Sequence, residues 1–140
     1  MERIEELEHT ADVGFRLEAD SLEGLFLAAA EGLRRALGHE ASGGRVEAHP
    51  LRVEGPDRER VLVAWLQELL TEGEARGAVP QPVQVRLGRG PRGDLTLNAD
   101  IRWHPRAGTG PLREIKGVTY HGLEVGEREG RWFATVVFDV

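Results

Sequence analysis

The chain contains no cysteine, which excludes disulfides, thiolate metal ligands and cysteine nucleophiles. No apolar run approaches the roughly 20 residues that a membrane-spanning helix needs. The charged segment at residues 1–6 lacks the apolar core of a signal peptide. These absences predict a cytoplasmic protein that does not enter a membrane.

Positive charge is also scarce. The chain carries 24 acidic against 18 basic residues, a formal net charge of −6, and Lys116 is its only lysine. A protein that grips nucleic acid directly usually has a clustered basic surface, whereas these arginines are dispersed. We therefore expect no direct nucleic-acid binding, and any role near RNA would run through a protein partner.

The motifs of common hydrolases and nucleotide-binding enzymes are missing. There is no Gly-x-Ser-x-Gly elbow, and the only serines are Ser21, at a predicted helix start, and Ser42, in a polar loop. A phosphate-binding loop with its lysine is absent, because the sole lysine lies within a predicted strand.

The 40% hydrophobic residues suffice for the core of one domain over residues 1–140. Asp20 and Glu23 form a capping-box pattern at the start of a helix that ends at Gly38. A second helix opens at Asp57 and is expected to end by Gly73. Alternating apolar residues predict strands at 2–9, 13–19, 46–54, 83–87, 95–103, 114–125 and 131–139. This order indicates an α+β fold in which two amphipathic helices pack on one mixed or antiparallel sheet. Pro50 suggests that its strand is an edge strand or carries a bulge.

The stretch at 114–125 is unusually polar for a strand. Strand alternation would place Lys116, Val118 and Tyr120 on one face, and Thr119 and His121 on the other. Buried polar groups need partners, so this composition suggests selection for something besides packing. Lys116 and His121 could act as acid–base groups, or they could be hydrogen-bonded strand residues.

Two carboxylates are candidate metal ligands: Asp12, in the first predicted turn, and Asp139, at the end of the last strand. The Val140 carboxylate or backbone oxygen would add a ligand, and such oxygens suit a hard cation such as Ca²⁺ or Mg²⁺. His9 would instead suit a softer ion such as Zn²⁺. Turn and terminal aspartates are more often solvated or capping residues, and the spacing alone does not bring positions 12 and 139 together.

Four segments together resemble the archease family in order and spacing across the whole chain. They are residues 9–14 (HTADVG), 65–70 (WLQELL), 114–123 (EIKGVTYHGL) and 138–140 (FDV). The chain departs from the family pattern at Ala64, where an acidic residue is frequent, at Gly117, where alanine is frequent, and in a shortened loop at 105–113.

This resemblance implies a small α+β protein that is not itself a catalyst. Archeases assist an RtcB-type RNA ligase in tRNA splicing and RNA repair, by promoting guanylylation of the ligase and sustaining its turnover. By resemblance, Asp12, Asp139 and a Val140 oxygen would hold a divalent cation, with Ca²⁺ expected and Mg²⁺ or Mn²⁺ as alternatives. Lys116 would be a further functional residue beside it, with His9 as a second candidate for cofactor binding.

Two other function classes remain open at the level of sequence. The chain could be a small metal-dependent phosphohydrolase that uses Asp12, Asp139 and His9. It could also be a general chaperone or scaffold, whose polar strand residues only mark a binding face.

Overall fold

The computed structural model describes residues 2–8, 12–108 and 110–140, with only the backbone of Glu8 described. Its strands form two antiparallel sheets. The four-stranded sheet has the order β1 (Arg3–Glu8), β2 (Asp12–Ala19), β7 (Arg131–Asp139) and β6 (Gly117–Arg128). The three-stranded sheet has the order β3 (Glu47–Gly55), β5 (Leu95–Pro105) and β4 (Ala78–Arg89).

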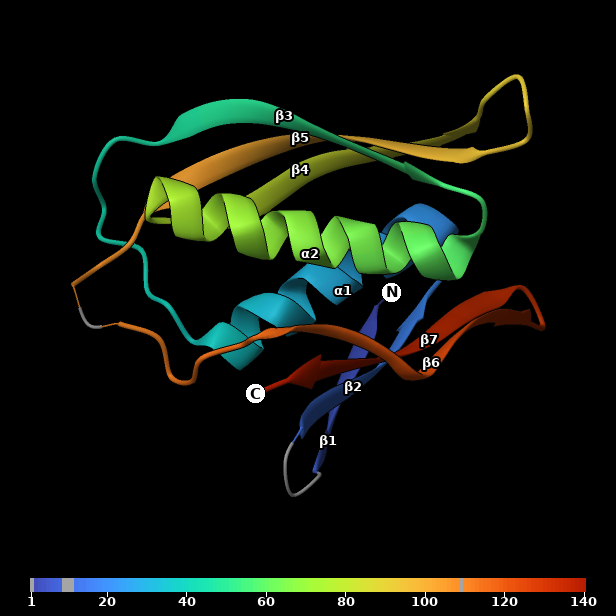
Figure 1. Ribbon diagram of the computed structural model, residues 1–140, viewed down its shortest axis with the longest axis horizontal. Coiled ribbons are helices and arrows are strands. Elements are labelled where there is room, and N and C mark those ends of the chain that lie inside the picture. The colour runs from blue at the N-terminus through green and yellow to red at the C-terminus, as the bar shows by residue number, and fades with distance from the viewer. Residues whose placement is uncertain (1, 9–11, 109) are drawn as a thin grey trace.

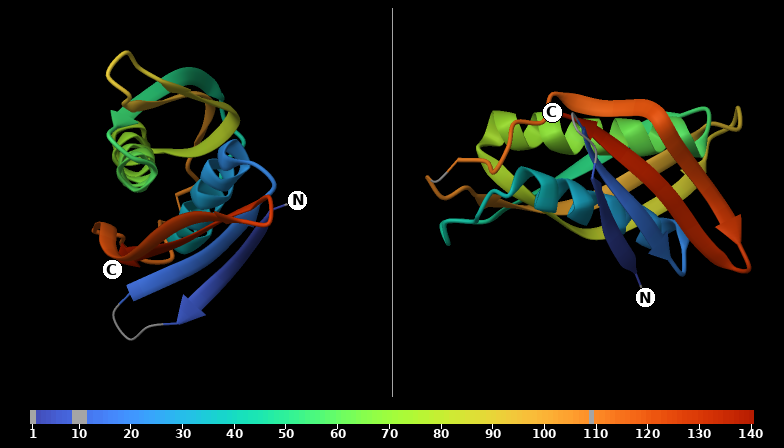
Figure 2. Two further views of the ribbon diagram at one scale, coloured as in Figure 1. Left: turned by 90° about the vertical axis from the view of Figure 1, so that its right-hand side faces the viewer. Right: turned by 90° about the horizontal axis from the view of Figure 1, so that it is seen from below.

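Both helices, α1 (Leu22–Leu37) and α2 (Arg58–Arg76), lie between the two sheets (Figure 1), and the end-on view of Figure 2 shows the same layers. The α+β class is confirmed, whereas the strands divide between two sheets instead of one. Because each helix faces a sheet on two sides, α2 buries more than a single narrow stripe. Trp65 of α2 is fully buried, and its Nε1 donates to the Phe26 carbonyl of α1 at 2.9 Å.

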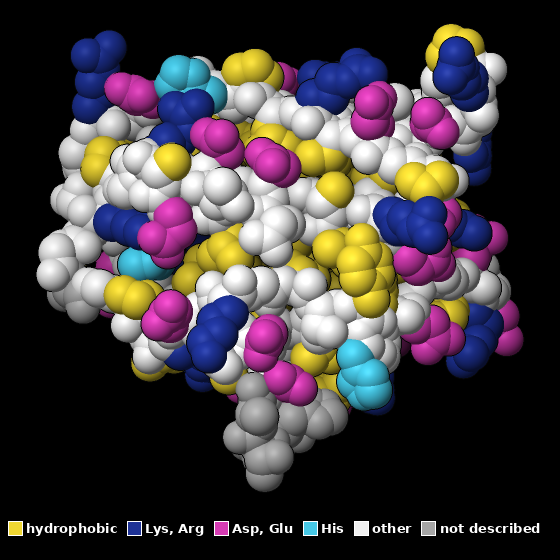
Figure 3. Space-filling model, in the orientation of Figure 1, with side chains coloured by type: hydrophobic (Ala, Val, Ile, Leu, Met, Phe, Trp, Pro, Cys, Tyr) yellow, Lys and Arg dark blue, Asp and Glu magenta, His cyan; other side chains and the backbone are white. Residues whose placement is uncertain are grey.

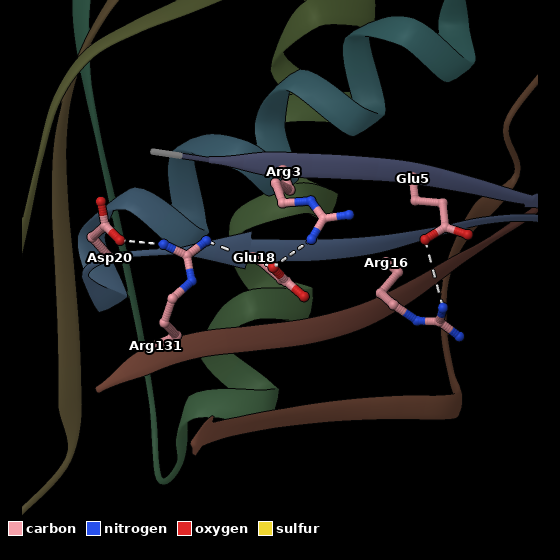
Figure 4. A network of polar contacts seen from close by, with 6 residues as sticks. All are labelled: Arg3, Glu5, Arg16, Glu18, Asp20 and Arg131. Carbon is pink, nitrogen blue, oxygen red and sulfur yellow. Dashed lines mark hydrogen bonds and ion pairs between the residues drawn. The ribbon is translucent and has the colours of Figure 1, made fainter. Parts of the chain in front are cut away.

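Two helix boundaries differ from the sequence prediction. Ser21, not Asp20, caps α1, because its hydroxyl accepts from the Gly24 amide at 3.0 Å. The Asp20 carboxylate instead pairs with Arg131 (Figure 4).

The second difference is that α2 continues past Gly73 and ends at Arg76, with Gly77, at φ 59°, as its C-cap. A Cβ at Gly73 would lie 3.1 Å from the Ala78 carbonyl oxygen, so this glycine permits close packing inside the helix. A glycine in a helical pattern therefore need not end the helix.

The strand predicted at 83–87 is longer in the structure, where β4 begins at Ala78. It includes Pro80 and Pro82, with a register shift between Pro82 and Gln84. β4 is an edge strand, where a missing N–H costs no ladder hydrogen bond on the open side. The same reasoning accounts for Pro50 in β3, whose predicted edge position is confirmed.

The strand predicted at 114–125 begins only at Gly117 and runs to Arg128. Ile115 is buried and Val118 packs against the core, which the predicted alternation from residue 114 does not allow. The pairing of β6 with β7 is irregular between Thr119 and Glu124, and Tyr120 there is 58% exposed.

The four-stranded sheet packs its inner face into the core through alternate residues of β7, as predicted for 131–139. These are Trp132, Ala134, Val136 and Phe138. Among the described residues, neither helix combines the length and apolar character that a membrane span requires.

Candidate functional site

Three chain segments meet at one end of the four-stranded sheet. Asp12 is the first residue of β2, Asp139 is the last residue of β7, and the two are direct cross-strand partners. Directly opposed residues of antiparallel strands share a face, with Cβ atoms about 4.5–5.5 Å apart. The sheet register thus brings together two carboxylates that lie at opposite ends of the sequence.

Lys116 reaches the same place from the other side of β7. Its backbone N–H donates to the Asp139 carbonyl at 2.7 Å, and the next residue, Gly117, pairs with Asp139 in the β6–β7 ladder. The Lys116 side chain is exposed, as is that of Asp139. The single lysine of the chain therefore leaves the backbone next to the paired aspartates.

The remaining predicted site residues fall in different environments. Val140 follows Asp139, and its side chain is half-buried against the core, so its backbone oxygen is the atom left for binding. His9 lies outside the described residues. His121 is exposed, and its backbone N–H donates to the Thr119 hydroxyl at 3.0 Å.

The charges at this end of the sheet are not compensated within the described chain. There, the side chains of Asp12, Lys116 and Asp139 make no hydrogen bond or ion pair. Within residues 2–8, 12–108 and 110–140, no group of three or more His, Cys, Asp or Glu side chains could hold a metal ion. A cation here would have two carboxylates from these segments, and backbone oxygens, waters or a partner would complete its ligands.

Gln67 of α2 is a neighbour that the residue patterns did not indicate. A Cβ built on Gly117 would lie 3.5 Å from the Gln67 Oε1 atom, so the amide reaches the backbone of the first β6 residue. In the sequence, Gln67 is a polar position between apolar residues of a helix, within the 65–70 segment that resembles the family. Helical periodicity cannot reveal which strand such a residue faces.

The larger cavities lie elsewhere. One of about 600 Å³ opens between α1 and β4, and its lining includes Arg34, His39 and His104. His39, expected in a polar loop, is 8% exposed, and its ring nitrogens have no hydrogen-bond partner among the described residues. Burial, reinforced by the Arg106 guanidinium, lowers the pKa of His39. Among the described residues, Asp12, Lys116, Asp139 and Val140 do not line this cavity.

The face drawn in Figure 3 shows acidic and basic side chains interspersed, without a continuous basic patch. Figure 3 has the orientation of Figure 1, so this is the face on which α2 lies toward the viewer.

Comparison with known proteins gives one consistent result. The sequence profile of the Archease protein family matches residues 4–140. Protein archease of Pyrococcus abyssi is 33% identical over 147 residues, with 100% of both chains covered. Protein archease of Methanosarcina mazei is 34% identical over 143 residues, covering 99% of this chain and 96% of that protein.

Solved structures agree with the fold. The solution structure of Methanobacterium thermoautotrophicum protein 1598 has a TM-score of 0.80 and 25% identity, and the match covers 98% of each chain. A Thermotoga maritima crystal structure, described as an archease and possible chaperone, has a TM-score of 0.63 and 24% identity over 96% of this chain and 94% of that one. The matches to the family and to its members over nearly the whole chain confirm the resemblance seen in the motifs: the chain belongs to the archease family.

Proposed function

We propose that this protein is a non-enzymatic activator of an RtcB-type RNA ligase, acting through a divalent cation at the Asp12–Asp139 end of the sheet. In this role it would promote guanylylation of the ligase and sustain its turnover during tRNA splicing or RNA repair. The observation that carries the proposal is the direct cross-strand pairing of Asp12 with Asp139, beside the sole lysine of the chain.

The donor set fits a hard divalent cation. Two carboxylates and the Val140 backbone oxygen offer only oxygen ligands, which suit Ca²⁺, with Mg²⁺ or Mn²⁺ as alternatives. When bound, such a cation would neutralise negative charge on phosphate oxygens. Two carboxylates leave coordination positions free for phosphates supplied from outside, as Mg²⁺ sites commonly do.

Lys116 supplies a second positive group. Its ammonium is compact and carries three donors, and the side chain is exposed, so it can reach phosphate oxygens presented by a partner. The backbone bond from Lys116 to Asp139 would keep this ammonium beside the paired carboxylates. We therefore assign Lys116 to orienting phosphates.

The placement of these residues favours an activator over an enzyme. Asp139 and Lys116 are exposed at the end of a sheet, and neither they nor Asp12 lines any of the five cavities described for the molecule. Enzymes usually bury most of a small substrate in a concave site. An exposed end of a sheet instead suits contact with the nucleotide pocket of a partner protein. The negative net charge is in keeping with a protein partner rather than RNA.

The test is a guanylylation assay with the RtcB-type ligase of the same organism, with and without this protein and a chelator. We expect the protein to stimulate guanylylation and the chelator to remove this stimulation. Asp12→Asn and Asp139→Asn should each reduce guanylylation to the level of the ligase alone. Asp94→Asn is the matched control, because Asp94 is an exposed aspartate in the β4–β5 turn. It should stimulate like the unaltered protein.

Other outcomes would favour the alternatives. Full stimulation by folded Asp12→Asn and Asp139→Asn variants would contradict the cation-dependent mechanism. Turnover of a phosphoester by the isolated protein would favour a phosphohydrolase. Suppression of aggregation of unrelated clients, unaffected by chelator, would favour a general chaperone.

A further inference from the structure

A short segment before β6 determines where Lys116 lies. We call residues 112–116 the strap. Its first part is attached to the carboxyl end of α1, and its last residue is attached to Asp139 at the end of the four-stranded sheet. The strap therefore connects the carboxyl end of α1 with the Asp139 end of the four-stranded sheet, two places that are far apart along the chain.

At α1 the strap satisfies carbonyls that the helix leaves unpaired. The last carbonyls of a helix have no intrahelical partner. The helix's own cap, Gly38, donates its amide to the Arg34 carbonyl at 2.9 Å, and from the strap the Leu112 amide donates to the Leu37 carbonyl at 2.6 Å. Arg113 Nη1 donates to the Ala36 carbonyl at 3.0 Å.

The Arg113 contact has the features of a specific attachment. It joins residues 77 positions apart in the sequence and is partly buried. A guanidinium near a helix carboxyl end also interacts favourably with the helix dipole. Close packing supports the same attachment, because a Cβ at Gly38 would come within 2.5 Å of the Leu112 Cβ.

From Arg113 the chain has little freedom before it reaches the sheet. Ile115 is buried in the core, at 7% exposure, and the Lys116 amide is bonded to the Asp139 carbonyl. The backbone position of Lys116 is thus held by an attachment at each end of the strap.

We propose that Arg113 is a positioning residue for Lys116: by anchoring the strap to α1, it holds the ammonium beside Asp12 and Asp139. This inference rests on the proposed function, because the role it gives to Lys116 is phosphate orientation at that cation site. The resemblance to the family did not indicate Arg113, which lies in the segment where this chain departs from the family pattern.

The single lysine permits a direct test. Reductive methylation with ¹³C-formaldehyde labels Lys116 and the amino terminus only, and it preserves the positive charge. Mn²⁺, bound in place of Ca²⁺, should broaden the Lys116 methyl signal in the unaltered protein. In Arg113→Met, which keeps an aliphatic chain but removes the donors, the broadening should fall several-fold while Mn²⁺ affinity stays the same.

Hydrogen exchange gives a second measurement that needs no cation. Exchange of the Lys116 amide should become about tenfold faster in Arg113→Met, because an attachment that resists local opening is lost. Arg92→Met is the matched control: Arg92 lies in the exposed β4–β5 turn and makes no ion pair or hydrogen bond with the described residues. It should leave both signals unchanged.

The outcomes separate the two proposals. Unchanged broadening and unchanged exchange in folded Arg113→Met would overturn the positioning role. The role would also be overturned if Mn²⁺ bound to the unaltered protein without affecting Lys116. Failure of Mn²⁺ to bind at all would count against the cation site, and the exchange measurement would then decide the role of Arg113 by itself.

Discussion

The two ends of the four-stranded sheet differ in whether their charged side chains form ion pairs. At the paired end, Arg131 bridges Asp20 and Glu18, and Glu18 also meets Arg3 (Figure 4). At the open end stand Asp12, Asp139 and Lys116, whose side chains have no ion pair among the described residues. The same β2 and β7 strands supply residues to both ends.

This difference indicates that the paired end stabilises the fold, whereas the open end has residues selected for a function other than stability. Opposite charges across strands stabilise a sheet, and like charges placed directly opposite destabilise it. Where a protein departs from a local rule of this kind, the departure often marks a functional site. The following predictions test this reading of the two ends.

The largest effect should come from adding a cation to the open end. Ca²⁺ at about 100 times its Kd should raise the free energy of unfolding by about 2.7 kcal/mol, because it binds only the folded chain. Asp139→Asn should abolish this gain, whereas Arg131→Met, at the paired end, should keep it. The measurement is denaturant unfolding in CaCl₂ against EDTA; an equal gain in Asp139→Asn would place the cation elsewhere.

Disrupting the paired end should have a smaller effect, on stability alone. Arg131→Met removes the bridges to Asp20 and Glu18 and should lower the free energy of unfolding slightly at low salt, as expected for ion pairs at an exposed surface. The loss should shrink in 1 M NaCl because salt screens exposed charges. A salt-independent loss would indicate that packing of the arginine stem, and not charge, stabilises this end.

A charge reversal should convert the open end into a paired one. Asp139→Lys places a cation opposite Asp12 and should stabilise the metal-free protein by about 0.5 kcal/mol. The same variant should gain nothing from Ca²⁺. Unfolding in EDTA checks the first expectation, and destabilisation there would show that the two aspartates do not repel in the native protein.

The smallest effect concerns a group at neither end. Burial and Arg106 lower the pKa of His39, so between its ordinary value of 6.5 and its lower folded value the unfolded chain binds more protons. Stability should therefore fall as the pH drops through this window. His39→Leu should reduce the slope of the unfolding free energy against pH, measured by denaturant unfolding across this window. An unchanged slope in His39→Leu would mean that the pH dependence comes from another group.

Local sequence patterns predicted the secondary structure correctly where the apolar face or the cap of a helix or strand was distinct. The helix that ends at Gly38, the opening at Asp57 and the alternation in 131–139 are all confirmed. The wrong predictions arose where tertiary contacts decide the outcome. Ser21 and not Asp20 is the N-cap of α1, and the Asp20 carboxylate instead forms an ion pair with Arg131, 111 residues away. The first part of β4 was not predicted because it contains Pro80 and Pro82, which a strand tolerates at the edge of a sheet. Which strand lies at the edge depends on the whole sheet and not on the strand's own sequence.

For the candidate site, the sequence by itself determined which chemical groups are available: the carboxylates of Asp12 and Asp139, a single lysine ammonium at Lys116, and no thiol. Only the tertiary structure decided that the backbones of these residues meet, because cross-strand register is set by pairing between β2, β6 and β7 and not by distance along the chain. It alone also revealed the attachment of Arg113 to α1, since a hydrogen bond between a loop side chain and a helix carbonyl leaves no periodic trace in the sequence.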